Sequence, residues 1–142
     1  MNLRKTNLFF GLLLFLVFLA TGYYMMQYFK PEHLDNHVMR MQIRANHIYI
    51  LFIALLNVIA FKSESKIKHT MSKYLDSIFR MLLLLAGIIS VVAFLKEHTG
   101  NLGVRSWTLS TVILSVTAVG FLLTNELLAV ALKKKIDDGV SK

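Results

Sequence analysis

Four long apolar runs fill most of the sequence and restrict the chain to a membrane fold. They cover residues 8–29, 45–62, 74–95 and 107–132, and the first carries no charged side chain over its 22 residues. A helix rises about 1.5 Å per residue, so about 20 residues cross a hydrocarbon core of roughly 30 Å. Hydrophobic residues make up 56% of the chain. We therefore predict an all-α membrane protein, with four transmembrane helices in an up-down bundle forming one domain.

Basic residues lie unevenly beside these runs and indicate an orientation. The side that holds both termini carries Arg4, Lys5, Lys62, Lys66, Lys68, Lys73, Lys133, Lys134 and Lys135. The other side carries Lys30, Arg40, Arg44, Lys96 and Arg105. By the positive-inside rule, both termini face the cytoplasm across a cell inner membrane. For the first run, a cleaved signal peptide is the alternative, because Arg4 and Lys5 precede it.

The chain is basic, with a net charge of +8, and contains no cysteine. Because its Lys and Arg residues flank apolar runs, we assign them to topology and lipid head groups, and we expect no nucleic-acid partner. Without cysteine, disulfides, thiolate zinc sites and iron–sulfur clusters are excluded. The expected partners are the lipid bilayer and either other membrane subunits or further copies of the chain.

A polar stripe leads into the second apolar run. Its members follow each other at intervals of 4, 3, 4 and 3 residues, which at about 100° per residue places them on one helix face: His33, His37, Arg40, Arg44 and His47. Pro31 is suited to the first position of a helix. We therefore expect the second helix to start there and to extend beyond the membrane at its outer end.

This stripe is the main candidate for a functional site. If the stripe turns inward toward the end of the third span, it forms an outer-face site for an anionic ligand or lipid head group. The residues of this site would be Arg40, Arg44, His47, His98 and Arg105. Two alternatives use histidine as a ligand: a haem b between His47 and His98, or a divalent metal at His33 and His37. The fourth interpretation is a solvated interfacial face that binds nothing.

Two further features lie inside the apolar runs. Arg80 and Glu126 have similar depth, so we predict a buried ion pair between them, with Asp76 as the rival partner of Arg80 and Asn57 nearby. A charged side chain left unpaired in lipid costs several kcal/mol of free energy, whereas an ion pair between two helices fixes how they align. Ser110, Thr117 and Thr124 follow at heptad spacing, and the small residues Thr111, Ser115, Ala118 and Gly120 lie close by. Together they predict a close-packing helix face.

No phosphate loop, nucleophile–base pair or paired carboxylate site is recognisable. We therefore favour a small integral inner-membrane protein that acts as a binding or accessory subunit over an enzyme. A b-type haem or metal-binding redox protein is the alternative.

Overall fold

The chain forms an all-helical structure, here a computed structural model that describes residues 3–29, 35–63, 70–97, 103 and 105–140. Helix α1 (Leu3–Tyr24) continues into a π-helical turn, η1 (Met25–Phe29). It is followed by α3 (His37–Lys62), α4 (Thr70–Lys96) and α5 (Ser106–Val140). The described part of the chain contains no strand.

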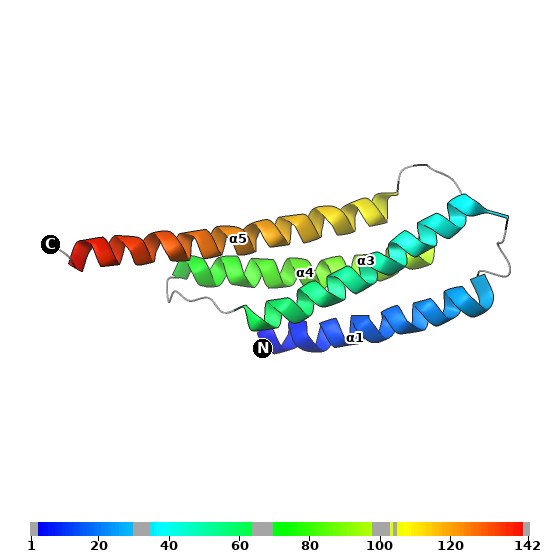
Figure 1. Ribbon diagram of the computed structural model, residues 1–142, viewed down its shortest axis with the longest axis horizontal. Coiled ribbons are helices and arrows are strands. Elements are labelled where there is room, and N and C mark those ends of the chain that lie inside the picture. The colour runs from blue at the N-terminus through cyan, green and yellow to red at the C-terminus, as the bar shows by residue number, and fades with distance from the viewer. Residues whose placement is uncertain (1–2, 30–34, 64–69, 98–102, 104, 141–142) are drawn as a thin grey trace.

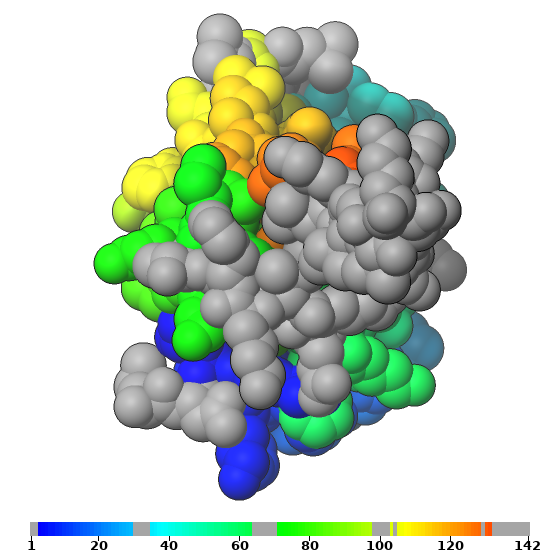
Figure 2. All heavy atoms as spheres, turned by 90° about the vertical axis from the view of Figure 1, so that its left-hand side faces the viewer, coloured from blue at the N-terminus to red at the C-terminus, as the bar shows by residue number. Residues whose placement is uncertain are grey.

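Successive helices run antiparallel, and both termini lie toward the same end of the bundle (Figure 1). Helices α1, α3 and α4 contact one another, while α5 packs mainly along α4. We call the end where α3 begins the Arg44 end, and the opposite end the Arg80 end. Figure 2 looks onto the Arg80 end, where α1 (blue) and the first turns of α4 (green) occupy neighbouring parts of the surface. The predicted up-down bundle is confirmed.

Four helices are long and apolar enough to cross a membrane: Leu3–Phe29, His37–Lys62, Met71–Lys96 and Ser106–Leu128. Each helix exposes large apolar side chains, such as Leu16, Leu55, Leu85 and Val116. An exposed apolar surface on every helix fits lipid contact rather than water. The four predicted spans are therefore present, with boundaries shifted by several residues.

The boundaries of two helices differ from the prediction. Helix α3 begins at His37, and the side chain of Asn36 caps it by accepting a hydrogen bond from the Met39 N–H at 2.9 Å. The predicted start at Pro31 lies outside the described residues, but Asp35 and Asn36 are not helical, so the helix is shorter at this end. Helix α5 continues past Lys133 to Val140, because lysine ends a membrane span without breaking a helix.

Small residues let the helices approach closely. A Cβ atom on Gly11 of α1 would lie 3.0 Å from the Ala54 carbonyl oxygen of α3. On α5 the buried residues include Thr108, Thr111, Ser115, Ala118 and Asn125. Of the predicted packing face, Thr111, Ser115 and Ala118 are buried, whereas Thr117 and Thr124 are exposed.

Candidate functional site

The described part of the polar stripe lies on the first three turns of α3. His37 and Arg44 are exposed, while Arg40 and His47 are partly buried. His33 lies outside the described residues. Arg40, Arg44 and His47 lie on one side of α3, next to η1, whereas His37 is not among the described residues of that groove.

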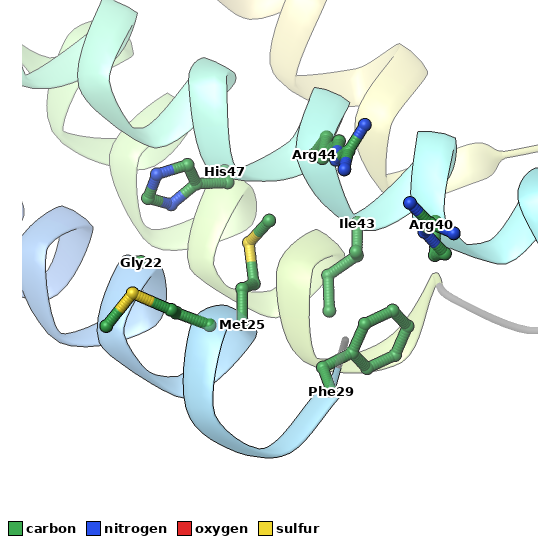
Figure 3. A pocket seen from close by; sticks show the side chains of 8 residues that line it. Gly22, Met25, Phe29, Arg40, Ile43, Arg44 and His47 are labelled. Carbon is green, nitrogen blue, oxygen red and sulfur yellow. The ribbon is translucent and has the colours of Figure 1, made fainter. Parts of the chain in front are cut away.

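Arg40, Arg44 and His47 border a groove of about 230 Å³ between α3 and the end of α1. The rest of its described lining is apolar: Gly22, Met25, Met26, Phe29 and Ile43. Figure 3 shows Gly22, Met25 and His47 in one part of the groove and Phe29, Ile43 and Arg40 in the other. The groove thus combines cationic groups from α3 with an apolar wall from α1 and η1. π-helical turns are rare and are often found at functional sites.

His47 is held in place by three contacts with α1. Its Nδ1 lies 3.0 Å from the Thr21 Oγ1, and its ring stacks on Phe18 with centroids 4.1 Å apart. A Cβ atom on Gly22 would lie 3.2 Å from Cε1 and 3.5 Å from Nε2. The Cε1–Nε2 edge therefore lies against Gly22, and glycine leaves room there for the imidazole ring.

Arg105 does not join this groove. Its guanidinium donates to the Asn46 Oδ1 and to the Gln42 carbonyl oxygen, the latter at 3.4 Å. Gln42 and Asn46 are buried on a different face of α3 from Arg44. The predicted five-residue site is therefore divided: Arg40, Arg44 and His47 share one groove, Arg105 belongs to another cluster, and His98 lies outside the described residues.

A buried polar cluster surrounds Asn46 and joins three helices. The Asn46 amide donates to the Ala93 carbonyl at 2.9 Å and to the Glu97 carbonyl at 3.3 Å. The Thr108 hydroxyl lies 2.9 Å from the Asn46 Oδ1 and 2.5 Å from the Glu97 Oε2. Every polar atom named here faces another helix, so this cluster stabilises the bundle.

Glu97 also caps the start of α5. Its carboxylate accepts hydrogen bonds from the N–H groups of Trp107 at 2.6 Å and Thr108 at 3.0 Å. A carboxylate at a helix N-terminus satisfies free N–H groups and interacts favourably with the helix dipole. Sequence reasoning missed this role, because Glu97 lies well before the start of α5 at Ser106 and outside the local capping positions.

At the other end, Arg80 pairs with Asp76 rather than with Glu126. The Arg80 Nε donates to Asp76 Oδ2 at 2.8 Å, and Nη2 donates to Oδ1 at 3.0 Å. Nη1 and Nη2 also donate to the carbonyl oxygens of Ala60 and Ser63 at 2.6 and 2.8 Å. The preferred partner Glu126 is thus corrected to the rival. Asp76 lies one turn away on the same helix, so the pair forms without tertiary alignment.

A second polar contact near Arg80 links α1 to the bundle. The buried Asn7 amide donates to the Asn57 Oδ1 at 2.7 Å and to the Arg80 carbonyl at 3.3 Å. Asn57 was expected near Arg80, whereas Asn7 was not considered. Asn7 is hard to recognise in the sequence because it precedes the first apolar run and resembles a flanking residue.

The described residues contain no group of three His, Asp or Glu side chains that could hold a metal ion. His33 and His98, on which the metal and haem alternatives depend, lie outside the described residues. No family model, curated protein or solved structure matches this chain.

Proposed function

We propose that the groove between α3 and η1 binds the anionic head group of a lipid or similar amphiphile, and that the chain acts as a membrane-embedded binding or accessory subunit. The observation that carries this proposal is the shared lining of the groove. Arg40, Arg44 and His47 supply positive or hydrogen-bond-donating groups, while Met25 and Phe29 supply an apolar wall.

The position of the groove supports an amphiphile over a water-soluble ion. Met26 is 60% exposed and Tyr28 is 62% exposed, so the η1 side is open at an apolar surface. Arg44 is exposed one turn before His47, close to where the apolar part of α3 begins. A head group beside Arg44 could therefore keep its hydrocarbon chain against apolar side chains.

The orientation follows from charge. Because the basic residues concentrate beside the Arg80 end, we infer that this end and both termini face the cytoplasm of a cell with an inner membrane. The groove then opens at the outer face. Arg40 and Arg44 at that face oppose the charge bias, and binding of an anionic group would account for their presence.

Lipid titration of the purified protein tests the proposal. Dioctanoyl phosphatidate should bind more tightly than dioctanoyl phosphatidylcholine when complexes are counted by native mass spectrometry. Arg44→Ala should weaken phosphatidate binding by about fivefold, equivalent to about 1 kcal/mol for one basic group near a lipid surface.

Lys96→Ala is the matched control. Lys96 is exposed at the same end of the bundle, lies 5.7 Å from the Trp107 ring and is not among the groove residues. We expect it to change binding by less than about twofold, within the usual range for a surface substitution. Equal losses in the two variants, or equal binding of the two lipids, would refute the proposal.

A further inference from the structure

Lys96 and Trp107 mark where the membrane surface crosses α4 and α5 at the Arg44 end. Both side chains are exposed, and the Lys96 Nζ lies 5.7 Å from the centroid of the Trp107 ring. Large apolar side chains are exposed close beside them in the chain, namely Leu95 and Leu109. Tryptophan and lysine concentrate at the boundary between hydrocarbon and head groups. The hydrocarbon boundary therefore crosses α4 and α5 near these two residues.

Contacts between helices relate this level to α3 and α1. The Asn46 amide of α3 donates to the carbonyl oxygen of Glu97, the residue after Lys96, at 3.3 Å. His47 follows Asn46, and its Nδ1 lies 3.0 Å from the Thr21 Oγ1 of α1. The boundary therefore crosses α3 near Asn46 and α1 near Thr21. Because α1 and α3 run antiparallel, the last residues of α1, the turn η1 and the first turns of α3 lie beyond it.

The arrangement and length of the helices agree with this placement. At the Arg44 end, α1 and α3 reach farther along the long axis of the bundle than α4 and α5 do (Figure 1). Tyr28 lies about 34 Å along the chain of helical residues from Lys5, which is exposed near the opposite end, whereas the hydrocarbon core is about 30 Å thick. The head-group layers add roughly 5–7 Å on each side. Tyr28 thus reaches the head-group layer without extending far into water.

The exposed aromatic side chains of α1 and η1 change type at the same level. In the first part of α1 they are Phe9 and Phe15, which have no polar atom; beyond the boundary they are Tyr23, Tyr24 and Tyr28. The Tyr24 and Tyr28 rings stack with centroids 6.0 Å apart. Tyrosine is suited to a membrane surface because its ring is apolar and its hydroxyl needs a polar partner. This change fits a helix that passes from hydrocarbon into head groups.

We propose that η1 and its tyrosines form an interfacial anchor. At the Arg44 end, the α1–α3 pair projects past the α4–α5 pair, and Tyr23, Tyr24 and Tyr28 lie among lipid head groups. The partner of this surface is therefore the head-group layer of the bilayer. The inference goes beyond the proposed function, because it concerns the depth of each helix pair in the membrane and needs no ligand in the groove.

Tryptophan fluorescence in vesicles measures this depth, because Trp107 is the only tryptophan of the chain. The protein is reconstituted into phosphatidylcholine vesicles whose lipids carry bromine either near the head group or near the end of the acyl chain. We expect the head-group-proximal bromines to quench Trp107 more strongly than the chain-end bromines. Tyr28→Trp in a Trp107→Phe background should show the same preference, together with partial quenching by aqueous acrylamide.

Leu16→Trp in the same Trp107→Phe background is the matched control. Leu16 is 61% exposed and Tyr28 is 62% exposed, so the two positions differ in depth and hardly in exposure. Twelve helical residues separate them by about 18 Å, which is more than half of the hydrocarbon core. We expect the chain-end bromines to quench the tryptophan at position 16 more strongly. Tyr23→Trp gives a second position beyond the boundary if circular dichroism shows that Tyr28→Trp does not fold.

The other possible results would overturn the inference. Stronger quenching by chain-end bromines at position 28, as at position 16, would place η1 in the hydrocarbon. Full quenching by acrylamide with none by either brominated lipid would place η1 in water and leave its surface for a soluble partner. Stronger quenching of Trp107 by chain-end bromines would show that the boundary is placed wrongly. None of these measurements uses phosphatidate, so the binding of anionic lipids in the groove is tested separately.

Discussion

Replacing Arg80 with methionine should strongly destabilise the protein. Arg80 is 3% exposed and makes two hydrogen bonds to Asp76. It also donates to the carbonyl oxygens of Ala60 and Ser63, which lie at the end of α3. The variant leaves a carboxylate without its counterion and two carbonyl groups of α3 without these donors.

The size of the loss follows from these contacts. Breaking a buried ion pair by removing one partner costs about 3–5 kcal/mol, and the partial exposure of Asp76 (22%) places Arg80→Met near the lower value. Asp76→Asn should cost about 2 kcal/mol, because it leaves the buried guanidinium without its counterion while the amide oxygen still accepts one hydrogen bond. In the double variant the unpaired charge is absent and the remaining cost is about 2 kcal/mol for the two carbonyls. The coupling energy is therefore about 3 kcal/mol.

Unfolding in mixed detergent micelles, followed by circular dichroism, measures these free energies. Glu126→Gln combined with Arg80→Met is the comparison, and we expect those two effects to add within about 0.5 kcal/mol. Strong coupling of Arg80 to Glu126, with additive effects at Asp76, would show that the ion pair has been assigned wrongly. A loss of less than about 1 kcal/mol for Arg80→Met would mean that Asp76 is well solvated without it.

The sequence predicts the four helices well because span length and hydropathy are local properties. It fails at the helix ends, where single side chains decide the boundary. Asn36 caps α3, so this helix begins after the predicted start at Pro31. Helix α5 continues through Lys133, because leaving the membrane does not end a helix. Neither outcome is set by the apolar pattern.

The candidate site is predicted in part for a similar reason. Periodicity correctly gathers Arg40, Arg44 and His47 on one side of α3, but it cannot say which helix faces them. Arg105 was expected beside them, yet it donates a hydrogen bond to the buried Asn46 side chain, which lies on another face of α3. Rotation of a helix about its axis depends on tertiary packing, which a single sequence does not specify.

Three further predictions concern packing and topology. Asn46→Leu should cost about 2–3 kcal/mol in detergent unfolding, because the Arg105 and Thr108 donors lose their shared acceptor; a loss below about 1 kcal/mol would contradict this. Gly11→Ala should cost about 1–3 kcal/mol by overpacking against α3, and no loss would show that α1 can shift freely. Reporter fusions at residues 62 and 135 should both report cytoplasm and one at residue 101 the outer side, because basic residues concentrate at the Arg80 end. The opposite pattern would place the groove on the cytoplasmic face, where anionic lipids are abundant, and would change which membrane leaflet supplies its ligand.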